Sequence, residues 1–451
     1  MKNLIILLFA LLTINVVKSQ GCLPQGITFT SQEQIDNFQV NYPGCTEIKG
    51  DVIISDYFPE NITNLNGLGV LNSIRGDLKI IVNPVLTSLA GLEGLTSIDS
   101  TLTISNNIGL ITLTGLEGLT SIGGDLTLID NDALTNLSGL AGLTSIGRNI
   151  YLSDNNALTS LTGLEGLNSI DGNLNISNHI GLINLTGLEG LTSIGGKLNI
   201  TSNDFLISLT GLDGLSFIAD LYLHDNSDLT SLAGLAGLTS IGGHFSIVSN
   251  DALTSLSGLE GLTSIGDGLG IVNNKSLTSI TGLGALTSIG GGLWITSNDG
   301  MTNLSGLDSI KANSITDLTI YFNSNLKECE IYSICQYLTA PNGNINIHDN
   351  APGCNSQEAI SQSCNAGVGE NIFATNYEIS PNPANEKITI SSSSISSNSW
   401  LSIFNVNAVK AMEVHLTDSE TQINISALPQ GVYFLRLQNE KIVEVMKMVK
   451  E

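Results

Sequence analysis

One column of acidic residues is the clearest sign of possible chemistry in the sequence. A carboxylate recurs at one position of a repeated GLxGL phrase, and its copies are Glu93, Glu117, Glu165, Glu189, Asp213 and Glu260. If the phrases stack at the spacing of β-strands, neighbouring carboxylates lie about 4.8 Å apart and repel each other unless a cation intervenes. Calcium prefers oxygen ligands, so Glu165, Glu189 and Asp213 are the candidate metal ligands.

A solvated acidic edge is the simpler interpretation of the same column, and we favour it. Three copies of the phrase carry Ala141, Ala236 or Gly284 in place of the carboxylate. A continuous ion site would need a carboxylate in every copy. The sequence therefore predicts no cofactor, with calcium as the one metal left open.

Catalytic patterns do not appear in the sequence. A catalytic site needs a nucleophile, a base and a group that orients them, or a metal with correctly spaced ligands. No G-x-S-x-G, H-E-x-x-H or P-loop pattern occurs. The histidines are scattered over different repeat positions: His179, His224, His244, His348 and His415. We expect a protein that is not an enzyme.

A second column carries aromatic residues on the predicted outer face. Tyr151, Tyr222 and Trp294 recur at every third copy of the repeat, among Thr, Asn and Ser. A flat ring offers contact area and its polar neighbours offer hydrogen bonds, which suits an extracellular glycan or protein ligand. The alternative is that single surface aromatics occur here by chance.

A 24-residue repeat must position both columns. The stretch LTGLEGLTSIGG occurs at 113–124 and again at 185–196. A period of this size predicts a solenoid. Alternating apolar residues, such as Leu126 and Leu128, predict one strand per coil and a parallel sheet along the array. Gly139 and Gly142 disfavour a long helix, so we expect a mainly β solenoid of about thirteen coils between Val52 and Ile347.

An asparagine column accompanies each strand. Its members are Asn83, Asn107, Asn131, Asn155, Asn203, Asn226, Asn250, Asn274, Asn298 and Asn323. A buried amide can satisfy the backbone of a tight turn, so stacked copies predict a ladder of hydrogen bonds. His179 replaces the asparagine once, and we expect a satisfied structural histidine there rather than a ligand.

Six cysteines lie outside the repeats, in two clusters. They are Cys22 and Cys45, then Cys329, Cys335, Cys354 and Cys364. Their positions at the two ends of the array predict disulfides in capping segments. Metal binding is the alternative, although no pair has C-x-x-C spacing. The last four cysteines leave three pairings open.

Charge and the N-terminal segment indicate the compartment. The chain has 16 Lys and Arg against 41 Asp and Glu, a net charge of -25, which argues against nucleic acid as a partner. Residues 1–19 have Lys2, an apolar run and the small residue Ser19, which is the layout of a signal peptide. A retained anchor is the alternative, but the run is shorter than the ~20 residues of a membrane span. We expect no transmembrane segment in the mature chain.

The repeat pattern L-x-x-I-x-x-x-L-x-I-x-x-N-x-x-L resembles leucine-rich repeats, and more closely the receptor L-domain family, over about residues 22–364. The resemblance implies a right-handed parallel β-solenoid. It also implies an N-terminal cap, residues 20–50, in which a Cys22–Cys45 disulfide closes a helix over the first coil. We place the solenoid repeats at 51–325 and a C-terminal disulfide cap at 326–364.

The remaining residues form a linker, 365–376, and a domain, 377–451, whose short alternating strands predict a small Ig-like β-sandwich. ISPNPAN at 379–385, LPQGVYFLRL at 428–437 and the basic end VMKMVK resemble the C-terminal sorting domain of the type IX secretion system. The matching motif positions are Pro381, Asn382, Pro383, Gly431 and Tyr433.

This resemblance implies export by the type IX machinery, removal of the domain, and a passenger that is secreted or held on the outer surface of a Gram-negative cell. An Ig-like adhesion module with no sorting role is the alternative.

The combined expectation is a non-catalytic binding or adhesion scaffold. The first alternative is a surface-layer or matrix component that self-associates. The second is an ice- or mineral-binding protein, suggested by the regular column Thr96, Thr120, Thr144, Thr192, Thr239, Thr263 and Thr287. Asn168 and Ser216 interrupt that column.

Overall fold

The computed structural model describes residues 21–56, 62–367, 377–392, 399–406, 409–416, 418, 420–438 and 443–451. The chain divides into two compact units, Met1–Cys364 and Asn365–Glu451. The predicted signal peptide and residues 368–376 of the predicted linker lie outside the described residues. In the described ranges, no helix is both long and apolar enough to cross a membrane.

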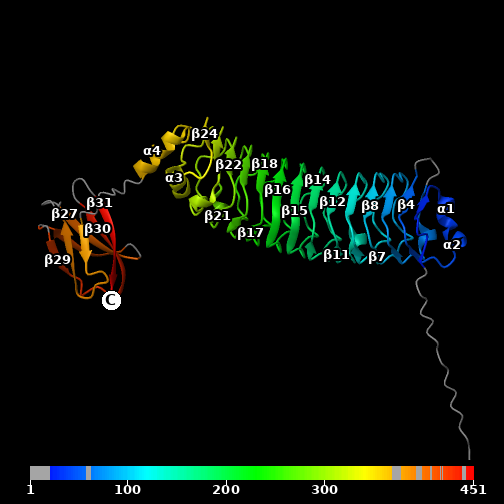
Figure 1. Ribbon diagram of the computed structural model, residues 1–451, viewed down its shortest axis with the longest axis horizontal. Coiled ribbons are helices and arrows are strands. Elements are labelled where there is room, and N and C mark those ends of the chain that lie inside the picture. The colour runs from blue at the N-terminus through cyan, green and yellow to red at the C-terminus, as the bar shows by residue number, and fades with distance from the viewer. Residues whose placement is uncertain are drawn as a thin grey trace, which may run out of the picture. The chain divides into compact units, whose positions relative to one another are not determined.

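The first unit is a parallel β-solenoid, as the period of the sequence predicts (Figure 1). Leu126 and Leu128 point into the core and are fully buried, while Thr127 between them is half-buried on the outer face. Each strand pairs in parallel with the strand of the next coil and in strict register, so that Leu126 faces Ile150 and Ile150 faces Leu174. Burial of stacked leucines and isoleucines therefore holds the coils together.

The long sheet contains one strand from the N-terminal cap and one from each of thirteen coils. These are β2 (Ile27–Phe29), β4 (Val52–Ser55), β6 (Leu78–Ile81), β8 (Leu102–Ser105), β10 (Leu126–Ile129), β12 (Ile150–Ser153), β14 (Leu174–Ser177), β15 (Ser193–Thr201), β16 (Phe217–His224), β18 (Phe245–Val248), β20 (Leu269–Val272), β22 (Leu293–Thr296), β23 (Leu318–Tyr321) and β24 (Ile345–His348).

A second set of two-residue strands runs along the array. It comprises β1 (Gly21–Cys22), β3 (Glu47–Ile48), β5 (Ser73–Ile74), β7 (Ser97–Ile98), β9 (Ser121–Ile122), β11 (Ser145–Ile146), β13 (Ser169–Ile170), β17 (Ser240–Ile241), β19 (Ser264–Ile265) and β21 (Ser288–Ile289). β15 and β16 are long enough to pair both with strands of the long sheet and with the two-residue strands. The described coils contain only short 3-10 helices: η1 (Asn66–Leu68), η2 (Ser138–Leu140), η3 (Thr281–Leu283) and η4 (Ala312–Ser314).

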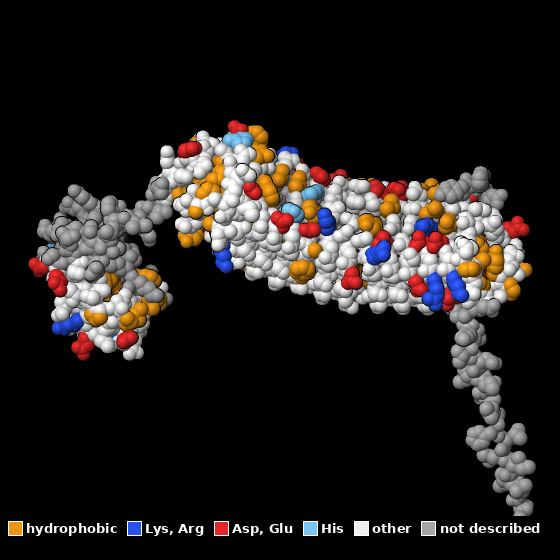
Figure 2. Space-filling view, in the orientation of Figure 1, with side chains coloured by type: hydrophobic (Ala, Val, Ile, Leu, Met, Phe, Trp, Pro, Cys, Tyr) orange, Lys and Arg blue, Asp and Glu red, His pale blue; other side chains and the backbone are white. Residues whose placement is uncertain are grey.

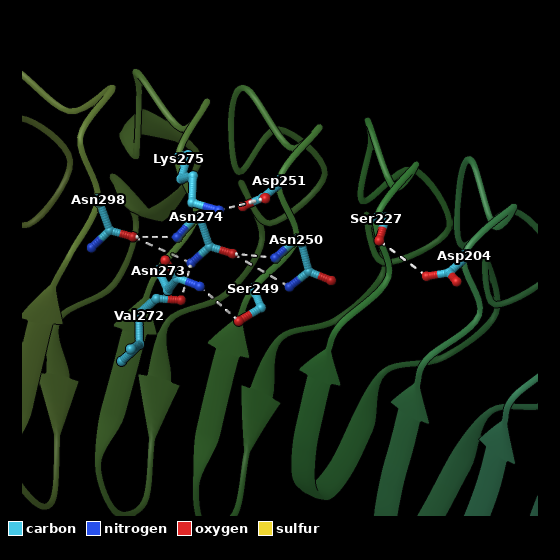
Figure 3. A network of polar contacts seen from close by, with 10 residues as sticks. All are labelled: Asp204, Ser227, Ser249, Asn250, Asp251, Val272, Asn273, Asn274, Lys275 and Asn298. Atoms are coloured by element: carbon cyan, nitrogen blue, oxygen red, sulfur yellow. Dashed lines mark hydrogen bonds and ion pairs between the residues drawn. The ribbon is translucent and has the colours of Figure 1, made fainter.

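The asparagine column forms the predicted ladder (Figure 3). Both the backbone N–H and the Nδ2 of Asn274 donate to Oδ1 of Asn298, at 3.1 and 3.3 Å. The same Nδ2 also donates to the carbonyl oxygens of Ile247 and Val272, both at 3.0 Å. Asn274 thus satisfies backbone groups of two coils in the buried interior of the solenoid. The ladder continues to Asn350, which the 24-residue spacing did not predict because it lies 27 residues beyond Asn323.

His179 interrupts the ladder. Its backbone N–H donates to Asn203 Oδ1 at 3.2 Å, and its Nδ1 lies 3.2 Å from the same oxygen. Its Nε2 is buried without a hydrogen-bond partner among the described residues. The histidine is therefore structural but only partly satisfied. Burial lowers the pKa of His179 to about 4.

The N-terminal cap covers the first coil. Ser31 Oγ accepts a hydrogen bond from Gln34 N and begins α1 (Gln32–Asp36), which is followed by α2 (Phe38–Asn41). The cap buries Ile35 and Phe38 against the solenoid core. The Cys22–Cys45 disulfide is present, as the family resemblance implies.

The C-terminal cap contains α3 (Tyr332–Thr339) and α4 (Gln357–Gly367). Disulfides join Cys329 to Cys354 and Cys335 to Cys364, which selects one of the three pairings that the sequence left open. α4 runs to Gly367, so the start of the predicted linker is helical.

The second unit is a small antiparallel β-structure. One sheet has the order β25 (Tyr377–Ser380), β26 (Lys387–Ser392), β29 (Glu420–Asn424), and the other has the order β28 (Lys410–Leu416), β27 (Ser399–Asn405), β30 (Gly431–Gln438), β31 (Val443–Lys450). Ile388 and Ile390 from the first sheet share one core with Leu401 and Leu435 from the second.

Replacing His179 with asparagine should stabilise the protein, increasingly so at low pH. The folded-state pKa of about 4 lies below the ordinary value of 6.5, so the unfolded chain binds the proton first. Stability is therefore lost as the pH falls from about 6.5 to about 4, by roughly 3 kcal/mol at full extent. Asparagine does not titrate and can accept from Asn155. Urea unfolding midpoints between pH 7.5 and 4 measure the effect.

The control for this substitution is His244→Asn, which removes an exposed histidine paired with Asp267. If the urea midpoints of the native chain and of H179N differ by the same amount at every pH, that result would contradict the claim that His179 causes the loss of stability at low pH.

Candidate functional site

The outer face of the long sheet carries the predicted aromatic column. Tyr151, Tyr222 and Trp294 occupy the same strand position, and the residues between them are in register: Asn175, Asn199, Ser246 and Gly270. Three strand spacings separate each aromatic residue from the next, which is about 14 Å. Figure 2 shows that uncharged polar side chains and backbone form most of the viewed solenoid surface. The aromatic rings are thus spaced sites on a largely polar face.

Of the three aromatic residues, Tyr222 contacts a lysine and a histidine side chain. Lys197 Nζ lies 5.1 Å from its ring centroid, in a cation-π contact. The ring of His224 meets it edge-on at 5.6 Å. His224 Nε2 lies 2.9 Å from Ser246 Oγ, and desolvation lowers the pKa of this half-buried histidine.

A Ser–His pair can in principle activate the serine as a nucleophile. Here Ser246 and His224 lie within paired strands, where the backbone N–H groups serve the sheet ladder. A nucleophile also needs donors aimed at the developing oxyanion and a group that orients the histidine. The described contacts of this pair include no oxyanion donor and no group that orients the histidine. The sequence analysis did not identify the pair, because its members are 22 residues apart.

Trp294 differs from the two tyrosines in its orientation. A Cβ atom at Gly268 or at Gly292 would overlap the indole, so the ring lies against the backbone of these two buried glycines. The side chain is half-buried. The three aromatic residues therefore share a column but do not present equivalent surfaces.

The acidic column has a structural role in its own turns. Gly163 N–H donates to Glu165 Oε2 at 2.9 Å, Gly187 N–H to Glu189 at 2.9 Å, and Gly211 N–H to Asp213 at 3.1 Å. The three glycines have φ between +112° and +117°, where other residues are strained. Each carboxylate thus satisfies a buried N–H in a left-handed turn.

Coils without the carboxylate show what it contributes. Where Ala141 or Gly284 stands in the column, the turn becomes the 3-10 helix η2 or η3, and its glycine is not left-handed. The Ala236 coil keeps the left-handed glycine. The carboxylate therefore accompanies one of two turn types, which the sequence pattern alone did not distinguish.

The described side chains do not form a metal site of the usual kind. They include no group of three or more His, Cys, Asp and Glu that could hold a metal ion. Calcium at Glu165, Glu189 and Asp213 stays a prediction, in competition with the turn contacts above.

The threonine column forms a second ladder. Thr144 Oγ1 donates to the carbonyl of Thr120 at 3.2 Å, and Thr263 Oγ1 to that of Thr239 at 3.0 Å. Ser216 continues the pattern by donating to Thr192. The hydroxyl protons thus serve the preceding coil rather than the solvent.

A shallow groove of about 360 Å³ follows the short strands β7 to β13. Its lining includes Asp99 and Asp171 from the first and last of these coils and Gly123 and Gly147 from the coils between them. The other lining residues are serine, threonine and isoleucine. The groove could hold a small polar molecule, but it contains no histidine or cysteine.

The predicted sorting motifs lie together in the second unit. Asn382 Oδ1 accepts from Val449 N at 2.9 Å, which ties the Pro381–Pro383 segment to the last strand. Tyr433 is buried and its hydroxyl donates to Pro429 O at 2.8 Å. Gly431 begins β30. The ISPNPAN motif and the basic C-terminal end are thus hydrogen-bonded to each other in the same domain.

Fold and motifs together define a repeat solenoid joined to a separate antiparallel β-domain. Residues 378–451 match the family of secretion system C-terminal sorting domains. No curated protein matches the chain. The matched domain belongs to the type IX secretion system and indicates secretion to the outer surface of a Gram-negative bacterium.

Glu165→Ala should lower the free energy of unfolding by about 1 kcal/mol, because the buried Gly163 N–H loses its acceptor. Glu165→Gln should cost less, because the amide oxygen can still accept. Urea unfolding in calcium-free buffer measures both, with the exposed Asp171→Ala as the control for loss of charge. If calcium binds instead, calcium should stabilise the native chain but not E165Q.

Removal of residues 378–451 should stop the passenger from reaching the outer surface, because the secretion machinery loses its recognition domain. Cell fractionation followed by immunoblotting measures the distribution. Tyr433→Phe, which removes only the hydroxyl, is the matched control and should be exported. Surface display of the truncated chain at the native level would refute the assignment.

Proposed function

We propose that the solenoid is a non-catalytic recognition or adhesion scaffold that acts outside the cell. One observation carries the proposal: an in-register outer face presents Tyr151, Tyr222 and Trp294 at equal three-coil intervals among hydrogen-bonding side chains. Evenly spaced contacts on a rigid sheet favour multivalent binding of an extended glycan or protein ligand, because later contacts form at high effective concentration.

The proposal includes no catalytic step. His244 and His348 pair with the exposed carboxylates of Asp267 and Asp349, at 3.1 and 2.7 Å. Neither arrangement brings a nucleophile to the histidine in the described contacts. Among the described contacts, the Ser246–His224 pair has neither oxyanion donors nor a group that orients the histidine.

Self-association is the second candidate, and a different surface favours it. Ile108, Ile111, Ile180, Ile183, Phe205 and Ile207 are 47–60 % exposed. They lie on the turns that follow β8, β14 and β15, that is, on one coil and on a pair of neighbouring coils. Exposed apolar groups of this kind are typical of contact surfaces. The threonine column supports ice or mineral binding less well, because its hydroxyl protons are used internally.

A surface-polymer and glycan binding screen separates the two candidates. The column variant combines Tyr151→Thr, Tyr222→Thr and Trp294→Thr, with threonine chosen because Thr127 and Thr319 occupy the same column. The edge variant combines Ile108→Thr, Ile183→Thr and Ile207→Thr. We expect saturable binding by the native chain, at least tenfold weaker binding by the column variant, and native binding by the edge variant.

The opposite pattern would favour the structural role. Concentration-dependent assembly in analytical ultracentrifugation, lost in the edge variant while no screened ligand binds, would replace recognition with self-association.

A further inference from the structure

Three aromatic side chains meet at the ends of β23 and β24, on the last two coils. The rings of Tyr321 and His348 are stacked, with centroids 4.9 Å apart and planes 3° from parallel. Phe322 meets both rings edge-on, at 5.1 Å from Tyr321 and 5.5 Å from His348. We call Tyr321, Phe322 and His348 the terminal aromatic cluster.

The cluster is open to solvent. Phe322 is 53 % exposed, and the His348 side chain is 44 % exposed. Figure 2 shows hydrophobic side chains beside a histidine and an acidic group at the β24 end of the solenoid. Packing of the core therefore does not account for these rings.

The backbone at Phe322 is strained. Its φ is +56°, in the left-handed region where a bulky residue is a real outlier. The equivalent residues of other coils also have positive φ: Val82, Asn106, Asp130, Asp154, Asn178, Ser202, Asp225, Ser249, Asn273, Ser297 and Asp349. Apart from Val82 these are small polar residues, Asn, Asp or Ser, and Asn and Asp are the types most favoured in this conformation. Phe322 therefore costs stability, as residues at binding sites often do.

Polar groups surround the rings. Asp349 Oδ2 lies 2.7 Å from His348 Nδ1, and its side chain is 62 % exposed. Thr319 and Asn346 lie in register on the same outer face. A flat aromatic surface with hydrogen-bonding neighbours suits the apolar face and the hydroxyl rim of a sugar ring. The net charge of -25 and the nearby carboxylate disfavour an anionic polymer.

We propose that the terminal aromatic cluster is a second site on the solenoid for a neutral polysaccharide. The exposed ring of Phe322 provides the stacking surface, the stacked pair of Tyr321 and His348 supports it edge-on, and Asp349 with His348 provides hydrogen bonds to hydroxyl groups. The inference rests on the recognition function proposed above, and it adds a contact at the C-terminal end of the sheet to those of the three-coil column.

Phe322→Asn tests the site without disrupting the fold, because Asn106, Asn178 and Asn273 occupy the equivalent position. The probes are cellulose, chitin, xylan, β-1,3-glucan and mannan, with the full chain. We expect the native chain to bind at least one of them. We expect F322N to bind it at least tenfold more weakly, with an unchanged or higher thermal midpoint.

Two results would overturn the site, and a third would refute the argument from strain. If F322N keeps native affinity while the column variant loses it, recognition stands but only on the column. A lower thermal midpoint for F322N would refute the argument from strain, and Phe322→Ser, matched to Ser297, would check that result. Absence of native binding to all five polysaccharides would exclude this ligand class, while binding of a protein ligand in the wider screen would leave the recognition function intact.

Discussion

A typical asparagine of the ladder is hydrogen-bonded to its own turn, to the strand of the preceding coil, and to the side chain of the asparagine in the next coil. Asn274 makes these contacts to Val272, Ile247 and Asn298. A buried amide left without partners would cost more than an ordinary lost hydrogen bond gains. A strand that slipped by one residue would break the ladder and turn its core leucines to the solvent. The ladder and the leucine core therefore specify the same register.

A fixed register converts a repeated position in the sequence into a straight column on the surface. The aromatic, acidic and threonine columns follow from it, each serving a different purpose. The same stacking leaves two open ends, because a terminal coil has no neighbour to cover its core. The disulfide-linked caps cover these ends, as Ile35 and Phe38 do at the first coil. Rigidity along the array is thus obtained from nearest-neighbour contacts alone.

Periodic features could be predicted from the sequence, because one coil dictates the next. The strands, the ladder and the Tyr151–Tyr222–Trp294 register belong to this group, whereas the sorting motifs were predicted from their resemblance to a known family. Local orientations could not be predicted. The carboxylate of Glu165 turns back to Gly163, Trp294 lies over two glycines, and His224 reaches Ser246 across a strand pair. The cluster at Phe322 was missed because it occurs once, at irregular spacing, where no periodicity marks it.

Native-state hydrogen exchange of the ladder amides tests the central claim most directly, namely that the asparagine ladder sets the register of the whole solenoid. The backbone N–H groups of Asn131, Asn226 and Asn250 donate along the ladder. They should exchange only through large-scale unfolding. The N–H of Asn155, which faces His179, should exchange faster through local opening. Fast exchange at every coil, or equal protection at Asn155, would show that the ladder does not hold the coils in register.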